Sequence, residues 1–295
     1  MIREHDVPAP AGRTLHVLEG GSEGGTPVFF HSGTPGAAGF HPSWVEDAEK
    51  RVIRLLSYDR PGYGESPPAD GRSVGDAAAD TAAVADALGI DRFCVWGISG
   101  GGPHTLACAA LLGDRVVAAA SLASPAPYPA EGLDWLEGMG EGNQEEFAAA
   151  LQGREVLKPL LEEMRTDILA TDAEGLAAEL ETLLGPADRE VLTGDLADYM
   201  VDVMKRALVK GTAGWMEESL AFTRPWEFGV EHITVPMLLL HGATDRFVPI
   251  SHGQWLAERI PDVEARLLPD DGHLTLVASR VPEVHAWLME QASSS

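Results

Sequence analysis

A serine between glycines is the clearest candidate for chemistry in this sequence. Ser99 stands in GISGGG (97–102), between a predicted strand ending near Trp96 and a predicted helix over residues 104–112. Larger side chains would collide with neighbouring backbone in such a strained turn, which lifts the serine hydroxyl above the sheet. The Gly100 N–H, at the helix start, would face the negative charge that develops on an attacked carbonyl. The plainer alternative is a turn that only packs closely or binds a phosphate, although no Gly-Lys-Ser/Thr of a Walker loop follows.

A serine hydroxyl becomes a good nucleophile only beside a base, which a carboxylate orients. Among ten histidines, His273 stands in PDDGHL (269–274), directly after the last predicted strand. Asp245 stands in HGATDRFVP (241–249), directly after the preceding strand. Either residue alone is explained as well by an exposed loop histidine or an Asx turn. Together, the order Ser99, Asp245, His273, each at the carboxyl end of a predicted strand, fits one catalytic face.

An early loop is expected to supply a second donor to the oxyanion. HSGTPG (31–36) follows a predicted strand, and its glycines and proline shape a tight turn. We expect the backbone N–H groups of Thr34 and Gly100 to form the pair of donors. A plain Pro/Gly turn is the alternative.

Short β-type segments alternate with longer helical ones, a pattern typical of a parallel sheet covered by helices. The predicted strands span residues 14–19, 27–30, 52–58, 93–97, 116–122, 235–240 and 265–268. Ser73 is a suitable N-cap for a helix over residues 74–88, and Gly89 follows that helix. Further helices are predicted over residues 251–260 and 281–289.

The alternation is interrupted once, by a helical segment over residues 125–228. Residues 126–200 contain 18 acidic and four basic residues, which predicts an acidic outer face on helices whose inner face is apolar. We therefore expect one core domain, residues 1–124 and 229–295, with the segment inserted as a lid. Four apolar residues of the lid are candidates to line a substrate pocket, although helix docking explains them equally well: Trp215, Met216, Phe222 and Trp226.

Composition narrows the choice of partners. The 295 residues carry 46 acidic and 21 basic side chains, a net charge of −25, so nucleic acid and anionic membranes are poor partners. Cys94 and Cys108 are too few for a disulfide framework or a cysteine metal site. Residues 1–10 lack the apolar region of a signal peptide, and no apolar stretch reaches 18 residues. We expect a soluble cytoplasmic protein with a small-molecule substrate, no cofactor and no metal; its oligomeric state is left open.

Five motifs together resemble the α/β-hydrolase superfamily, in its form with a helical cap: HSGTPG (31–36), YDRPGYGES (58–66), GISGGG (97–102), HGATDRFVP (241–249) and DDGH (270–273). The resemblance implies an eight-stranded, mostly parallel sheet, a nucleophile elbow after the fifth strand and a cap after the sixth. Among its branches, the chain is similar to proline iminopeptidase-like enzymes and small-ester hydrolases. The iminopeptidase pattern His-Gly-Gly-Pro-Gly is replaced here by HSGTPG, which argues against a peptidase.

These observations favour a cofactor-independent serine hydrolase that cleaves a small carboxylic ester or a related acyl compound through an acyl-enzyme. An iminopeptidase-like aminopeptidase, a C–C bond hydrolase, a lyase or an acyltransferase on the same residues is the alternative, and a non-catalytic ligand-binding protein is a third. An aspartate at position 99 would have indicated a dehalogenase or an epoxide hydrolase.

Other conspicuous residues are expected to be structural. We expect Asp59 and Arg60 to hold their own turn together. His31, His104 and His241 are expected to be packed or hydrogen-bonded within the core rather than to act as bases.

Overall fold

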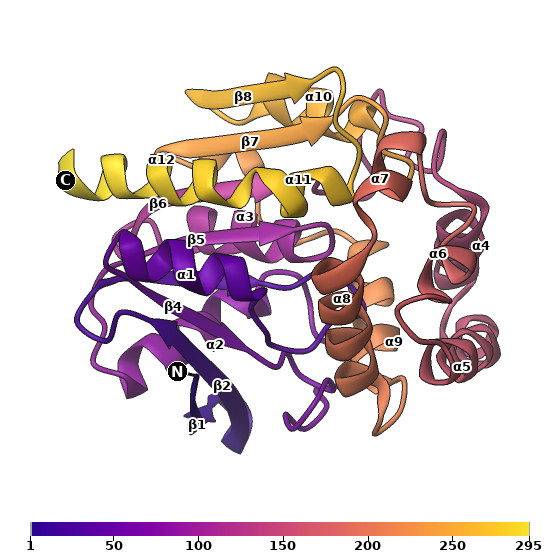
Figure 1. Cartoon of the computed structure of the whole chain (residues 1–295), viewed down its shortest axis with the longest axis horizontal. Helices are drawn as coiled ribbons and strands as arrows, with labels where there is room; N and C mark the ends of the chain where they lie inside the picture. The colour runs from indigo at the N-terminus through magenta and orange to yellow at the C-terminus, as the bar shows by residue number, and fades with distance from the viewer. Residues whose placement is uncertain (1, 295) are drawn as a thin grey trace.

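One eight-stranded sheet runs through the molecule (Figure 1), and it is described here from a computed structural model covering residues 2–294. The strand order is β1-β2-β4-β3-β5-β6-β7-β8. β1 pairs antiparallel with β2 and β2 antiparallel with β4, whereas every other pairing is parallel. The strands are β1 (Arg3–Ala9), β2 (Arg13–Gly21), β3 (Thr26–His31), β4 (Ile53–Tyr58), β5 (Phe93–Ile98), β6 (Val116–Leu122), β7 (Met237–Gly242) and β8 (Val263–Leu268). The α/β fold class expected from the sequence is confirmed.

The central strands form because their side chains are covered on both faces, whereas most side chains of the edge strands β1 and β8 are at least partly exposed. All residues of β5 and of β7 are buried, as continuous apolar runs in a parallel sheet should be. Within β3, Val28 and Phe30 join one hydrophobic cluster while Phe29 joins another, since successive side chains point to opposite faces. β1 was missed by the sequence analysis because only Val7 of this edge strand is buried.

Helices cover both faces of the sheet. α1 (Pro42–Lys50) and α12 (Val281–Ser294) pack against each other on one face, where α11 (Leu274–Ser279) joins α12. α2 (Asp76–Ala87), α3 (Gly101–Leu111) and α10 (Ile250–Arg259) contact the sheet through the other cluster. Single 3₁₀ turns span Pro10–Gly12 and Val230–His232. Ser73 and Asp76 exchange hydrogen bonds at the start of α2, where the sequence predicts a cap.

Six helices separate β6 from β7. They are α4 (Glu141–Gln152), α5 (Arg154–Ala170), α6 (Leu176–Glu179), α7 (Pro186–Val191), α8 (Gly194–Leu208) and α9 (Ala213–Phe222). In Figure 1 these inserted helices stand together at the end of the sheet toward which the arrowheads of β5, β7 and β8 point. Most members of a third hydrophobic cluster belong to them, and Ala37, Tyr63 and Leu274 join it from the rest of the chain. Throughout residues 2–294, no helix is long and apolar enough to cross a membrane.

Candidate active site

Ser99 occupies the turn between β5 and α3 in a backbone conformation that side chains avoid. Its φ is +56°, in the left-handed region, which costs a non-glycine residue about 1–3 kcal/mol. The neighbouring glycines make the turn possible. A Cβ on Gly97 would lie 2.5 Å from the carbonyl oxygen of Gly101, and a Cβ on Gly101 would collide with the carbonyl oxygen of His31. Glycines at positions 97 and 101 therefore allow the tight turn that presents the Ser99 side chain at the carboxyl end of β5.

His273 and Asp245 are hydrogen-bonded to each other although 28 residues separate them. His273 Nδ1 lies 2.7 Å from Asp245 Oδ2. The other oxygen, Oδ1, accepts the backbone N–H groups of Phe247 and Val248, both at 2.8 Å. Burial alone would lower the pKa of His273, but the carboxylates of Asp245 and, more weakly, Asp188 together hold the pKa above its ordinary value. Asp245 thus favours the tautomer that carries a proton on Nδ1.

Asp188 of α7 fixes the backbone on which His273 stands. Its Oδ2 accepts the N–H of His273 at 3.1 Å, and its Oδ1 accepts those of Leu274 and Thr275 at 2.7 and 3.2 Å. The Phe247 ring stacks on the His273 imidazole, with ring centroids 4.4 Å apart. Asp188 could not be recognised from the sequence, because its partners lie 85 to 87 residues away.

The loop after β3 lies against the elbow. A Cβ on Gly33 would lie 3.5 Å from the Cβ of Ser99, and a Cβ on Gly100 would lie 3.2 Å from the backbone nitrogen of Thr34. The first N–H groups of a helix have no partner within it, and Gly100 directly precedes α3. The structure therefore brings the two candidate N–H donors close to each other and to Ser99.

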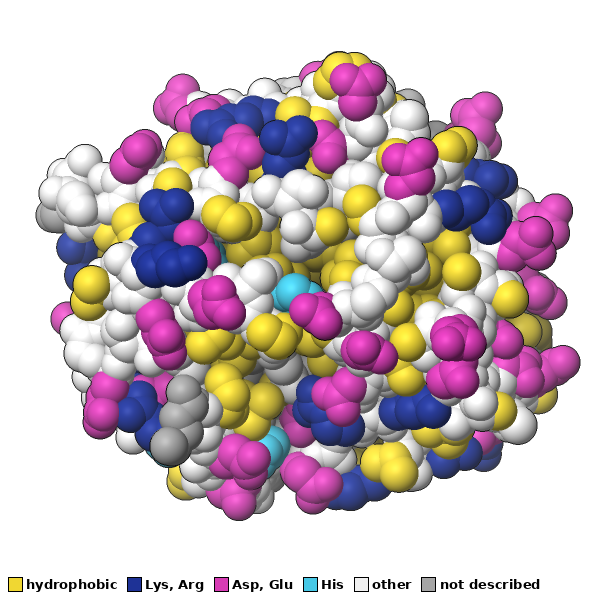
Figure 2. Space-filling model, in the orientation of Figure 1, with side chains coloured by type: hydrophobic (Ala, Val, Ile, Leu, Met, Phe, Trp, Pro, Cys, Tyr) yellow, Lys and Arg dark blue, Asp and Glu magenta, His cyan; other side chains and the backbone are white. Residues whose placement is uncertain are grey.

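A cavity of about 180 Å³ joins these groups, with Ser99, Thr34, Gly100 and His273 in its wall. Most of the lining is apolar and comes from both the sheet side and the inserted helices, for example Phe30, Trp44, Met139, Met164, Met204 and Leu274. Figure 2 shows a recess with hydrophobic side chains on its floor near the middle of the molecule. Among the described residues that line the cavity there is no lysine or arginine, and Glu146 is the one acidic side chain.

Two of the four predicted pocket residues line the cavity, Trp215 and Phe222. The prediction for Met216 and Trp226 is wrong. Met216 packs among the inserted helices, and Trp226 lines a separate hollow beyond the end of α9. The reason is that every residue from Gly214 to Phe222 is buried, so apolar side chains are found all around α9 and their spacing does not reveal the cavity side.

Glu146 is a buried carboxyl in the wall of the cavity. Trp215 Nε1 and Ser219 Oγ donate to its Oε1 at 2.9 and 2.6 Å. Burial raises its pKa to about 7. Because this carboxyl lies in the inserted helices, its nearness to Ser99 and His273 could not be read from the sequence.

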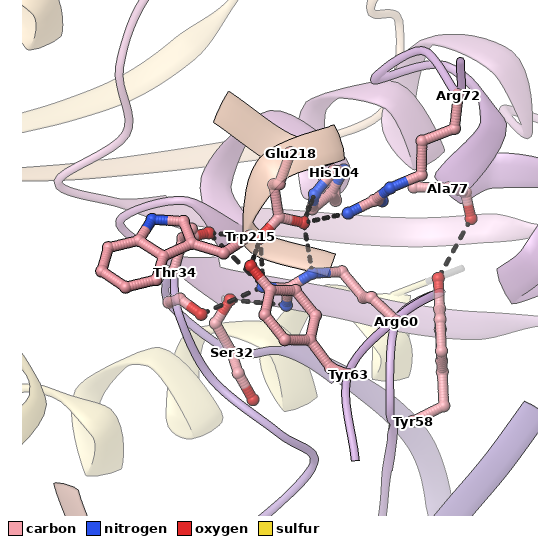
Figure 3. Close-up of polar contacts among 12 residues, drawn as sticks. Ser32, Thr34, Tyr58, Arg60, Tyr63, Arg72, Ala77, His104, Trp215 and Glu218 are labelled. Atoms are coloured by element: carbon pink, nitrogen blue, oxygen red, sulfur yellow. Dashed lines mark hydrogen bonds and ion pairs between the residues drawn. The ribbon is translucent and has the colours of Figure 1, made fainter. Parts of the chain in front are cut away.

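Glu218 of α9 is the centre of a buried polar cluster beside the elbow (Figure 3). Arg60 donates to it through Nε and Nη2 at 2.7 and 2.9 Å, and Arg72 through Nη2 at 2.7 Å. His104 Nε2 and the Tyr63 hydroxyl complete the cluster at 2.8 and 2.9 Å. Burial would raise the pKa of Glu218, but the guanidinium groups of Arg60 and Arg72 hold it well below its ordinary value. Glu218 is therefore an ionised carboxylate inside the protein.

Asp59 and His241 hold the core together as expected, whereas the side chains of Arg60 and His104 bond beyond their own part of the fold. Asp59 accepts the N–H groups of Ala38 and Glu65 at 2.7 and 2.9 Å, as a residue that holds its turn should. His241 Nε2 bonds the carbonyl oxygen of Val248 at 2.8 Å. His104 and Arg60, by contrast, reach across to the inserted helices through Glu218.

Comparison with known proteins agrees with this geometry. A family model described as the alpha/beta hydrolase fold matches residues 26–278. The chain belongs to the α/β-hydrolase family, as its five motifs predict, and it is an enzyme of the hydrolase class.

The more similar proteins differ in the reactions their names describe. A 2-hydroxy-6-oxononadienedioate/2-hydroxy-6-oxononatrienedioate hydrolase of a Pseudomonas species is 26% identical, over 88% of this chain and 85% of that protein. The dihydrolipoyllysine-residue acetyltransferase component of the acetoin cleaving system of Pseudomonas putida is 30% identical over 90% of this chain, which spans 65% of that protein. A thermophilic esterase from Thermogutta terrifontis has a TM-score of 0.68 and 20% identity, covering 98% of this chain and 99% of its own. That likeness shows the fold alone.

Proposed function

We propose that the protein is a cofactor-independent serine hydrolase that cleaves a small, uncharged carboxylic ester or related acyl compound. One observation carries the proposal: Ser99, held in left-handed backbone at the elbow, lines the same cavity as His273, whose ring is bound to Asp245. A strained, half-buried serine that shares a cavity with an oriented imidazole is the arrangement that acyl transfer requires.

The mechanism follows from the role of each group. Ser99 Oγ attacks the substrate carbonyl while His273 Nε2 takes its proton, and Asp245 stabilises the imidazolium that forms. The N–H groups of Thr34 and Gly100 bind the oxyanion. The intermediate collapses, the leaving alcohol takes the proton from His273, and water then attacks the acyl-enzyme by the same route in reverse.

We propose that the inserted helices, residues 125–228, act as a cap over the core formed by residues 1–124 and 229–295. The support is that Met164 and Trp215 of these helices line the cavity opposite Ser99 and His273. A cap that excludes water strengthens the electrostatic interactions at the reacting carbonyl, because the local dielectric is low.

The cavity favours a small substrate without negative charge. Its volume of about 180 Å³ is only slightly larger than that of a protein cavity of about 150 Å³ that holds benzene. An anionic acyl group would meet Glu146 and would find no lysine or arginine in the wall. A small-molecule substrate of this kind is the only partner that we propose.

Hydrolysis of a C–C bond by the same residues is the second candidate, because the name of the Pseudomonas relative describes a dienedioate hydrolase. That name specifies a dicarboxylate, which would bring two negative charges into a cavity whose described lining has no lysine or arginine. We therefore rank an uncharged ester above a dicarboxylate substrate.

The first test is covalent labelling. A fluorophosphonate should react stoichiometrically with the intact protein, and Ser99→Ala should abolish the labelling. Ser121→Ala is the matched control, since this buried hydroxyl has no hydrogen-bond partner and lies outside the cavity wall. An unlabelled native protein, or equal labelling of Ser99→Ala, would refute the nucleophile.

The second test separates the substrates. p-Nitrophenyl esters graded by acyl length should be turned over best with short, uncharged acyl groups, and hemisuccinate-type esters should be poor substrates. A 2-hydroxy-6-oxodienedioate should be cleaved slowly or not at all. Faster cleavage of the dienedioate than of every ester would replace the ester proposal with the C–C candidate.

A further inference from the structure

Arg60 holds the loop that carries the proposed oxyanion donor Thr34. This arginine, 1% exposed, donates from Nη1 to the carbonyl oxygen of Ser32 at 2.7 Å and from Nη2 to that of Gly33 at 3.0 Å. A planar guanidinium that binds two successive carbonyls allows their peptide planes little freedom to rotate. The orientation of the loop backbone thus depends on where the guanidinium lies.

The orientation of the Gly33 carbonyl also decides where the Thr34 N–H points. In a trans peptide the C=O of one residue and the N–H of the next point in opposite directions. Because the Gly33 oxygen is turned toward Arg60, the Thr34 N–H is turned away from Arg60. Thr34 lies in the cavity wall beside Gly100, so the N–H is available there to an oxyanion.

Glu218 in turn decides where the guanidinium lies. Its carboxylate binds Arg60 at two points, at 2.7 and 2.9 Å, and its Oε2 also accepts the Thr34 hydroxyl at 2.5 Å. Figure 3 shows Glu218 reaching from α9 toward both Arg60 and Thr34. Glu218, which binds both the Thr34 loop and the Arg60 guanidinium, therefore comes from the inserted helices, 158 residues beyond Arg60.

We propose that Glu218 is a positioning residue for the oxyanion hole: through Arg60 and the Thr34 hydroxyl it aims the Thr34 N–H into the cavity. This inference rests on the proposed serine hydrolase function. It means that the oxyanion hole is complete only when α9 is docked on the core.

The test compares Glu218→Gln with Glu217→Gln. Glu217 is the next residue of α9 and is equally buried, but it accepts the N–H of Gly71 at 2.8 Å and pairs with Arg154, away from residues 32–34. We expect Glu218→Gln to lower kcat about 10- to 100-fold, since a donor misplaced by about 1 Å loses most of its effect, with KM little changed. Glu217→Gln should keep kcat within about threefold of the native value.

A trifluoromethyl ketone separates positioning from general structural damage. Ser99 Oγ adds to its carbonyl carbon, the proton passes to His273, and the resulting hemiketal oxyanion requires the oxyanion hole. Glu218→Gln should weaken binding of this ketone by the same factor as kcat, while binding of the non-reacting alcohol of the same shape stays unchanged. Equal losses for ketone and alcohol would overturn the positioning role.

Arg60→Lys provides a second variant. It is needed because Glu218→Gln leaves the buried guanidinium groups of Arg60 and Arg72 without an anionic partner, and such a variant can fail to fold. Lysine keeps the positive charge, but its three donors on one nitrogen cannot reproduce the four hydrogen bonds that Arg60 makes to Ser32, Gly33 and Glu218. Arg72→Lys removes a guanidinium from the same carboxylate without touching residues 32–34, so it should lose less activity than Arg60→Lys. Equal losses in the two lysine variants would overturn the inference.

If the native protein neither reacts with fluorophosphonate nor turns over esters, the proposed function itself has failed, which is a different result.

Discussion

Replacing Asp245 with asparagine should abolish base catalysis without disturbing the fold. Asp245 Oδ1 accepts two backbone N–H groups, from Phe247 and Val248, so the amide oxygen of the new side chain must take that place. The amide NH₂ then faces His273 Nδ1, where Oδ2 stood at 2.7 Å. Nδ1 can only accept from it, so the imidazole proton moves to Nε2, which can no longer take the serine proton.

The size of the effect follows from these contacts. Turning the amide to restore the active tautomer would leave two buried N–H groups facing an NH₂, at a cost of roughly 2–6 kcal/mol in total. The active arrangement would then be populated to about 3% or less. Together with the loss of the charge that stabilises the imidazolium, we expect kcat to fall about 10⁴-fold.

The measurement is pre-steady-state acylation by a p-nitrophenyl ester as a function of pH. Since the Asp245 carboxylate holds the pKa of His273 above its ordinary value, the acid limb of kcat/KM should move to lower pH in Asp245→Asn. Asp271→Asn is the matched control: Asp271 lies in the loop of His273, after β8, but pairs with Arg280 at 2.7 Å. A variant that acylates within about tenfold of the native rate, with its acid limb unmoved, would refute the tautomer argument.

Three further predictions concern stability. Glu146→Gln should flatten the pH dependence of the free energy of unfolding. The Glu146 carboxyl, whose pKa is raised from 4.5 to about 7, stabilises the native state below pH 4.5, and this contribution is lost as the pH rises through 7. The free energy of unfolding, measured with urea at each pH, should therefore decline between pH 5 and 8 by up to about 3 kcal/mol in the native protein and by less in the variant; parallel curves of stability against pH would contradict this. Asp188→Asn turns an NH₂ toward a backbone N–H that Asp188 now accepts, so urea unfolding should show a loss of about 1–3 kcal/mol, and an unchanged midpoint would disprove the role of this side chain. Gly101→Ala should unfold at markedly lower temperature, because its Cβ would meet the carbonyl oxygen of His31, whereas Gly71→Ala, with no atom within 4 Å but φ +75°, should lose about 1 kcal/mol or slightly more.

Much of the fold was predictable because its signals are local. The apolar runs of β3 to β7 and the glycines of GISGGG report conformations that depend on a few neighbouring residues. The order Ser99, Asp245, His273 was also informative, since parallel strands bring their carboxyl ends to one edge of a sheet. β1 gave no such signal, because as an edge strand it buries only one side chain.

Most of the sheet, the turn at Ser99 and the three candidate catalytic residues could thus be predicted from the amino-acid sequence. The reason is that backbone conformation and strand direction depend on short stretches of chain. Only the tertiary structure showed which acidic groups lie around these three residues. Asp188 binds the backbone at His273, Glu146 lines the cavity, and Glu218 binds the loop that carries Thr34. Each of these acidic side chains comes from the inserted helices, and a single sequence does not distinguish the acidic residues there that become buried from those that stay exposed. Only packing withdraws these three, together with Glu217, from water. Each buried carboxyl then needs hydrogen-bond donors, which come from the core or, for Glu146, from α9 itself.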